Sequence, residues 1–103
     1  MERDLQPHAA EQLVREGATL VDVREPDELR DDGRFPGAVH IPLGDLGARA
    51  SELQGERLVL ACRSGARSAM AADALRASGY EAYNLDGGIL AWERAGLPVE
   101  RNT

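Results

Sequence analysis

The chain has 103 residues, of which 43% are hydrophobic and 29% charged, an ordinary composition for a globular protein with room for one domain. Its formal net charge of −6 argues against nucleic acid or an anionic membrane as the main partner. All the basic residues are arginine, so chemistry that needs a lysine, such as a Schiff base, is excluded.

Apolar runs of strand length alternate with helical runs along the chain. In chain order we expect a short edge strand at Leu5, a helix over 8–15, a strand over 19–23, an acidic helix from residue 25, a buried strand over 38–41, a broken helix over 43–53, a strand over 57–61, a helix over 66–77, a strand over 81–85 and a helix over 89–94. The 57–61 run is the most continuously apolar, which places it at the sheet centre. The pattern predicts an α/β fold: a single three-layer domain over residues 1–103, with a mainly parallel sheet of about five strands flanked by helices.

Cys62 is the single cysteine, which excludes several kinds of site. One thiol cannot form an internal disulfide or a Cys-x-x-Cys redox couple. His8 and His40 lie far apart in sequence with no second thiol to help, so a structural zinc site is excluded, and we expect neither a metal nor a cofactor. The amino-terminal residues lack the apolar stretch of a signal peptide, and no run reaches membrane-spanning length. We therefore expect a cytoplasmic protein, in which a free thiol can persist.

Cys62 lies directly after the central strand and directly before the helix over 66–77. Sites in open α/β sheets collect at the carboxyl ends of the strands. The unpaired N–H groups of a helix start favour a thiolate, and so do the nearby Arg63 and Arg67. A lone cysteine is more often a small buried hydrophobe, but two arginines so close after it are unusual for a core position. We therefore interpret Cys62 as a nucleophile.

The residues after Cys62 predict a concave nest for an anion. Gly65 permits the tight backbone curl that points successive N–H groups inward. Ser64 and Ser68 can add hydroxyl donors, and the guanidinium of Arg67 can face the anion or the loop carbonyls. The expected substrate-binding residues are Arg63, Ser64, Gly65, Ala66, Arg67 and Ser68.

Two chemistries suit this nest, and both begin with thiolate attack on an anionic substrate. Attack on sulfane sulfur gives a cysteine persulfide, whereas attack on phosphorus gives a cysteinyl phosphate that water must hydrolyse. The six residues from Cys62 through Arg67 make a smaller bowl than the seven-residue loop of cysteine phosphatases, which favours sulfur. A phosphatase or arsenate reductase remains the alternative enzyme, and a non-catalytic binding module is the alternative without chemistry.

The chain resembles rhodanese-domain sulfurtransferases over essentially its whole length, and three segments carry the match. The matching segments are 20–26 (LVDVREP) with 36–42 (PGAVHIP), the active loop 62–68 (CRSGARS), and 85–92 (LDGGILAW) with 96–99 (GLPV). One departure is visible. The family usually has Gly-His followed by Ile or Leu before Pro-Gly-Ala, where this chain has Gly33-Arg34-Phe35. We expect Arg34 to alter the hydrogen bonds of that loop or to add charge near the site.

The resemblance implies a sulfurtransferase with a rhodanese-like fold. Thiosulfate or another small anionic donor would load a persulfide onto Cys62, and the sulfur would pass to cyanide, a thiol or a protein acceptor. The loop amides would cradle the outer sulfur, with Arg63 and Arg67 favouring anionic donors. Because the chain has no second cysteine to resolve the persulfide, the acceptor must be another molecule.

Five further residues are expected to be structural. Asp22 and Arg24 end a strand on the site side, where we expect an internal ion pair. Trp92 is expected in the core, and His40 as a partly buried strand residue rather than a general base. Asp86 precedes a Gly-Gly turn and is expected to cap the following helix.

Overall fold

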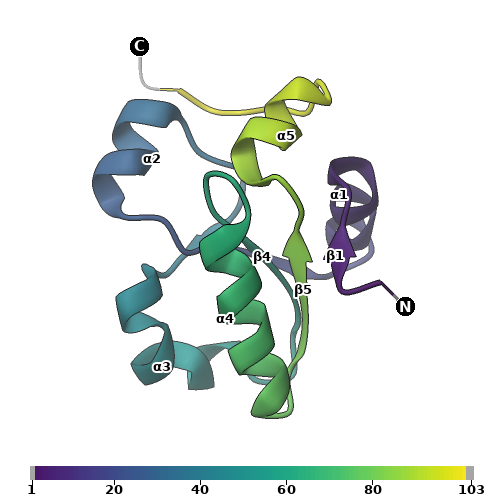
Figure 1. Ribbon diagram of the computed structural model, residues 1–103, viewed down its shortest axis with the longest axis vertical. Helices are drawn as coiled ribbons and strands as arrows, with labels where there is room; N and C mark the ends of the chain where they lie inside the picture. Colours follow the sequence, from purple (N-terminus) through teal and green to yellow (C-terminus); the bar gives the residue numbers. More distant parts are fainter. Residues whose placement is uncertain (1, 102–103) are drawn as a thin grey trace.

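The computed structural model describes residues 2–101, which form a five-stranded parallel sheet in the order β1-β5-β4-β2-β3 with helices on both faces (Figure 1). The strands are β1 (Asp4–Leu5), β2 (Thr19–Asp22), β3 (Val39–His40), β4 (Arg57–Ala61) and β5 (Glu81–Leu85). The helices are α1 (Pro7–Arg15), α2 (Pro26–Asp32), α3 (Leu46–Arg49) between the 3-10 turns η1 (Leu43–Asp45) and η2 (Ala50–Leu53), α4 (Ala66–Ala77) and α5 (Gly88–Arg94). The predicted α/β fold is confirmed. The domain expected over 1–103 includes residues 1, 102 and 103, which lie outside the described part.

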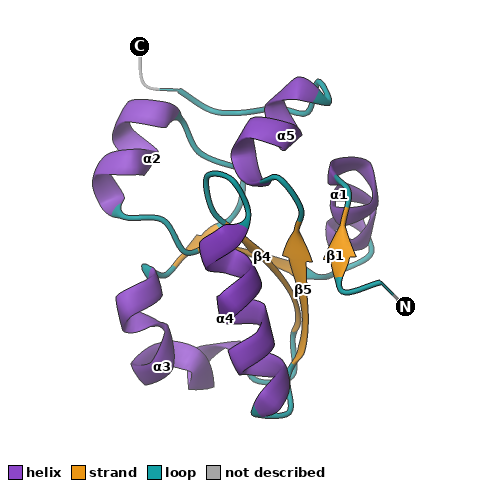
Figure 2. Cartoon of the chain, viewed as in Figure 1, coloured by secondary structure: helices purple, strands orange, loops and turns teal. Residues whose placement is uncertain are grey.

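β4 lies at the centre of the sheet, between β5 and β2, as its continuous apolar run predicts. Its side chains alternate between two cores, because successive residues of a strand face opposite sides. Leu58 and Leu60 pack in the core beneath α3 and α4, whereas Val59 and Ala61 pack in the core beneath α1 and α5 (Figure 2). Cys62 continues the row of Leu58 and Leu60, so its side chain faces α4.

β3 differs most from its prediction. We expected a buried strand over 38–41, but only Val39 and His40 pair with β2, and they form an edge of the sheet. Val39 is 38% exposed, whereas Ile41, just beyond the strand, is fully buried. A short apolar run does not reveal which of its residues face inward, and an edge strand is covered less than a central one.

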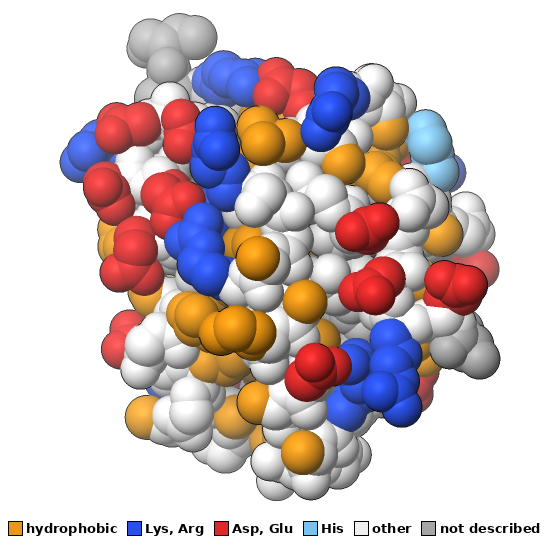
Figure 3. All heavy atoms as spheres, in the orientation of Figure 1, with side chains coloured by type: hydrophobic (Ala, Val, Ile, Leu, Met, Phe, Trp, Pro, Cys, Tyr) orange, Lys and Arg blue, Asp and Glu red, His pale blue; other side chains and the backbone are white. Residues whose placement is uncertain are grey.

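The predicted acidic helix is α2. Pro26 opens its first turn, and a reciprocal capping box between Glu25 and Glu28 fixes its start. Leu29 is its buried residue. The remaining face stays at the surface, where acidic side chains gather over α2 beside a stripe of arginines (Figure 3).

The segment after α5 returns across the molecule toward α2 (Figure 1). Arg34 and Glu100 exchange two backbone hydrogen bonds of 2.8 Å in an isolated antiparallel bridge. Phe35 is buried and packs edge-on against Trp92, with ring centroids 5.2 Å apart. The Arg34 backbone therefore anchors the carboxyl-terminal segment, the Phe35 ring packs against α5, and the Arg34 side chain is exposed.

Candidate active site

Cys62 lies at the carboxyl edge of the sheet, at the floor of a bowl formed by the loop of residues 62–68. The residue is 1% exposed, and its Sγ accepts the Gly65 N–H at 3.1 Å and lies 3.3 Å from the Ser68 hydroxyl oxygen. Gly65 has φ of 103°, a left-handed conformation that favours glycine and lets the loop curl back over the sulfur. The loop forms the start of α4, between α2 and α5 (Figure 1). Its exposed residues are Arg63, Ser64 and Ala66.

The bowl favours the thiolate through hydrogen bonds. Burial alone raises the pKa of the Cys62 thiol, because apolar surroundings disfavour the charged form. The Ser68 hydroxyl and the backbone N–H groups of Ser68, Gly65 and Ser64 outweigh burial, so the pKa of this thiol lies below its ordinary value. The lowering comes chiefly from these neutral donors rather than from the arginines that the sequence suggested.

Arg67 does not point where the sequence analysis expected. Its two terminal nitrogens donate to the Glu28 carboxylate at 2.6 and 2.9 Å, so its fork joins α4 to α2 instead of facing the loop carbonyls. The hydrogen bond to Arg67 holds the pKa of Glu28 at about 2. The same bond raises the pKa of Arg67. Both groups therefore stay charged, and each satisfies the other beside the bowl.

The first turn of α5 fixes the active loop through hydrogen bonds to its carbonyl groups. The N–H groups of Ile89 and Leu90 donate to the carbonyls of Cys62 and Arg63 at 2.9 and 3.3 Å. Gly88 has φ of 60°, and a Cβ there would lie 2.3 Å from the Arg63 carbonyl oxygen. With the two carbonyls bound on this side, the N–H groups that follow remain directed at the sulfur.

Asp86 does not cap α5, which corrects the sequence expectation. The residue before the helix is Gly87, and no side chain caps it. The Asp86 carboxylate accepts a hydrogen bond of 3.0 Å from Gln6 instead. The left-handed Gly87 sets the helix start, so a capping side chain has no role there.

The other structural expectations are confirmed. Asp22 and Arg24 form an ion pair of 2.8 Å with both side chains buried, and Arg24 also donates to the Gly33 carbonyl. His40 is partly buried, and its Nε2 lies 2.7 Å from the Arg24 carbonyl oxygen. Trp92 is 4% exposed and donates its indole N–H to the Pro98 carbonyl. These contacts fix the loops around the bowl.

Sequence reasoning missed three residues that shape the site: Glu28, Asn84 and Gly88. Asn84 is 3% exposed, and its Oδ1 lies 2.6 Å from the Ser68 oxygen. A signal for it existed, because an amide among the apolar residues of a buried strand needs hydrogen-bond partners. Glu28 carried no such signal, since it is one of several acids on a surface helix.

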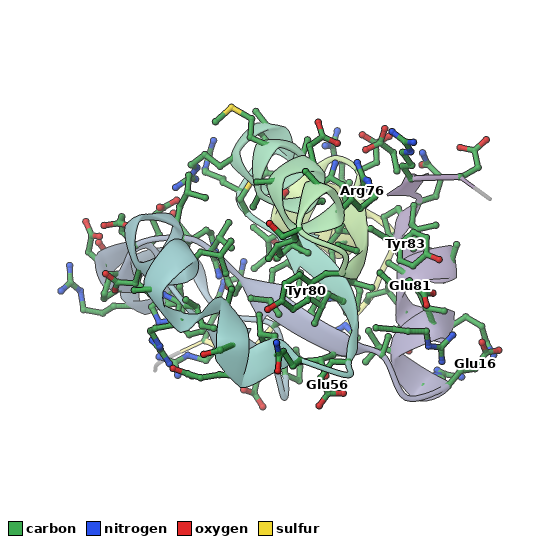
Figure 4. All side chains as sticks on the ribbon, turned by 90° about the horizontal axis from the view of Figure 1, so that it is seen from below. Glu16, Glu56, Arg76, Tyr80, Glu81 and Tyr83 are labelled. Atoms are coloured by element: carbon green, nitrogen blue, oxygen red, sulfur yellow. The ribbon has the colours of Figure 1, made fainter. Side chains whose placement is uncertain are left out.

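A cavity of about 520 Å³ lies far from Cys62, at the amino ends of β4 and β5. It is lined by residues 54–57 and 78–81, and Tyr80, Glu81 and Glu56 are seen at this end in Figure 4. The Tyr80 hydroxyl is already bound to the Ala50 carbonyl at 2.9 Å. A smaller hollow of about 160 Å³ is lined by Arg63 of the active loop together with residues of α2, α5 and the carboxyl-terminal segment.

Among residues 2–101, no helix is long and apolar enough to cross a membrane. Within the same residues, no three histidine, cysteine, aspartate or glutamate side chains lie together as metal ligands would.

The comparisons with known proteins agree with the fold. The Rhodanese-like domain family matches residues 6–95. The chain is 44% identical over 86 residues to a sulfurtransferase of Allochromatium vinosum, across 82% of this chain and 79% of that protein. It is 47% identical over 85 residues to an HTH-type transcriptional regulator of Mycobacterium tuberculosis, across 80% of this chain but only 37% of the regulator.

A solved structure gives the same picture. The crystal structure of a rhodanese-related protein from Thermoplasma volcanium superposes with a TM-score of 0.86 at 30% identity, covering 94% of this chain and 96% of that one. The family match and the similarity to a named sulfurtransferase support sulfur transfer in general. On this evidence the chain belongs to the rhodanese-like domain family.

Proposed function

We propose that the chain is a sulfurtransferase that carries sulfane sulfur as a persulfide on Cys62. The Cys62 thiolate attacks the outer sulfur of thiosulfate, a new S–S bond forms, and sulfite leaves with the electron pair of the broken S–S bond. A thiolate or cyanide then attacks the outer sulfur of the persulfide. Cys62 leaves as a thiolate, which restores the starting state.

One observation carries this proposal: the buried Cys62 sulfur accepts hydrogen bonds from the loop that follows it. The Gly65 N–H at 3.1 Å and the Ser68 hydroxyl at 3.3 Å stabilise the thiolate that both steps need. A persulfide extends the side chain by an S–S bond of about 2 Å, which brings the outer sulfur closer to the mouth of the bowl.

Sulfur transfer also fits the carboxylates around the bowl. A cysteine phosphatase usually needs an acid that protonates the leaving group, whereas sulfite and a thiolate leave without one. Asp22 and Glu28 are each bound by an arginine, at 2.8 and 2.6 Å. The hydrogen bond from Arg67 holds the pKa of Glu28 at about 2, so Glu28 is not available as a proton donor, which is consistent with sulfur chemistry.

The proposed partners follow from the single thiol. The donor is a small sulfane anion, and the acceptor is a separate thiol, cyanide or a protein. A reducing compartment such as the cytoplasm would keep Cys62 free and supply thiol acceptors, so we propose that location.

The test is transfer of sulfur from thiosulfate to cyanide, followed as thiocyanate. We expect turnover by the native chain and none by Cys62→Ser. Hydrolysis of an aryl phosphate above the Cys62→Ser background, without thiocyanate, would favour a phosphatase. No turnover together with a thiol pKa at or above about 8.5 would favour a binding module.

A further inference from the structure

Ser68 has more acceptors around its hydroxyl than it has protons. Its Oγ lies 2.6 Å from Asn84 Oδ1, 3.3 Å from the Gly65 carbonyl oxygen and 3.3 Å from Cys62 Sγ. A hydroxyl donates one hydrogen bond and accepts two. The side chains of Ser68, Asn84 and Cys62 are buried, so they must share this proton among themselves. The 2.6 Å contact indicates that Ser68 donates its proton to Asn84 Oδ1 while Cys62 is a neutral thiol. The Cys62 S–H can then donate to the Ser68 oxygen.

The sheet register brings these groups together. Asn84 of β5 lies opposite Leu60 of β4, two residues before Cys62, and it faces α4 as Cys62 does. On its other side Asn84 lies opposite Asp4 of β1, and its Nδ2 donates to Asp4 Oδ1 at 3.0 Å. An ionised carboxylate only accepts hydrogen bonds, so Asp4 fixes the amide with Nδ2 outward and Oδ1 toward Ser68. A line of hydrogen bonds thus joins the edge strand to the sulfur.

We propose that Asn84 is a positioning residue that competes with the Cys62 sulfur for the Ser68 proton and so limits how strongly the thiolate is stabilised. This rests on Cys62 as the sulfur carrier of the proposed function. When Cys62 ionises, the Ser68 hydroxyl gains by turning to the sulfur, but the turn leaves Asn84 Oδ1 buried without its donor. The limit has a chemical use, because a thiolate becomes a weaker nucleophile as its pKa falls.

Several charged groups lie near the loop, and Asp31, Asp32 and Glu93 line the hollow beside Arg63. Arg63 lies in the loop, Arg67 of α4 is paired with Glu28 of α2, and Asp4 of β1 lies beyond Asn84. Asn84→Leu keeps the charge of every one of these groups but removes the hydrogen bond to Asp4. A comparison with the Ser68→Ala background therefore separates an effect of the Ser68 proton from an effect of charge.

The test is the thiol pKa, measured from the pH dependence of Cys62 alkylation by iodoacetamide. Asn84→Leu removes the competing acceptor, and we expect the pKa to fall by about one unit, the size of a hydrogen bond to a charged group. In a Ser68→Ala background the same substitution should have no effect. An unchanged or raised pKa in Asn84→Leu, or a fall that persists without Ser68, would overturn the proposal.

Asp4 gives a second arm that leaves the buried residues intact, should Asn84→Leu fail to fold. Asp4→Ala frees the amide to turn its Nδ2 toward Ser68, so the pKa should fall. Asp4→Asn removes the charge but keeps an acceptor, so the pKa should stay at the native value. Equal falls in the two variants would show a charge effect and contradict the proposal. Alkylation needs no sulfur donor, so these outcomes are independent of whether the chain transfers sulfur.

Discussion

Arg63 and Arg67 lie four residues apart, yet their surroundings differ. Arg67 is neutralised by Glu28, whereas no salt bridge among residues 2–101 involves Arg63, which is exposed at the rim of the bowl. We therefore expect Arg63 to attract the anionic donor. Arg63→Gln should raise the KM for thiosulfate several-fold and change kcat little, since a rim charge acts on binding and encounter more than on the reacting atoms. Initial rates against thiosulfate concentration measure this, with Arg15→Gln on α1 as the control. Equal KM values in the two variants would contradict the role of Arg63.

Ser68 is the side-chain donor to the Cys62 sulfur, so its removal should raise the pKa of the thiol. Because a hydrogen bond to the charged form favours ionisation, Ser68→Ala should shift the pKa upward by about one unit, with the Gly65 N–H still in place. The alkylation rate at pH 7 should fall accordingly. The pH dependence of alkylation measures both, and a thiol that ionises as readily in Ser68→Ala as in the native chain would refute this assignment.

Only some of the contacts around the active loop could be predicted from the sequence. The contacts of Gly65 and Ser68 with Cys62 could be predicted, because all three residues lie within the same loop. The partner of Arg67 could not be predicted, because Glu28 lies 39 positions away and nothing in its neighbouring sequence distinguishes it from the other acidic residues. The role of Asn84 depends on the register of three strands, which a single sequence does not reveal.

At the scale of elements, the Glu28–Arg67 pair joins α2 to the start of α4. Glu28 has a pKa of about 2 in the folded chain against 4.5 ordinarily, so its contribution to stability is full above pH 4.5 and is lost as the pH falls from 4.5 toward 2. Arg67 is 36% exposed, which screens the pair. We expect Glu28→Gln, which keeps a capping residue, to lower the free energy of unfolding by about 1 to 2 kcal/mol at pH 7.

Urea unfolding at pH 7 and at pH 3.5 checks this expectation. The difference between Glu28→Gln and the native chain should be smaller at the lower pH. Asp31→Asn, which breaks an exposed pair with Arg30 on the same helix, is the control and should change little. A larger difference in the free energy of unfolding between the two chains at pH 3.5 than at pH 7 would contradict this role of Glu28.

The contact between the α5 start and the active loop depends on Gly88. Gly88→Ala adds positive-φ strain and a clash with the Arg63 carbonyl oxygen at 2.3 Å. Gly55→Ala is a matched control, because Gly55 has φ of 82° but open space around its Cβ position. We expect about 1 kcal/mol of destabilisation at Gly55 and at least twice that at Gly88, with slower Cys62 alkylation only at Gly88. Equal losses of stability would show that the close approach does not matter.

At the scale of the whole molecule, the order of elements and the central place of β4 could be predicted, because parallel α/β folds alternate apolar strands with helices. The edge strand at Leu5 and the broken helix over 43–53 were also confirmed. The length and exposure of β3 could not be predicted, because they depend on which strand forms the edge of the sheet. The role of Phe35 could not be predicted either, because its ring packs against Trp92, 57 positions along the chain.

We propose that Cys62 alone carries the transferred sulfur. The most direct measurement is the intact mass of the chain after incubation with thiosulfate and removal of small molecules. We expect a gain of one sulfur atom per chain, its loss on addition of cyanide, and no gain in Cys62→Ser. No added sulfur with thiosulfate or a polysulfide, or the same gain in Cys62→Ser, would contradict it.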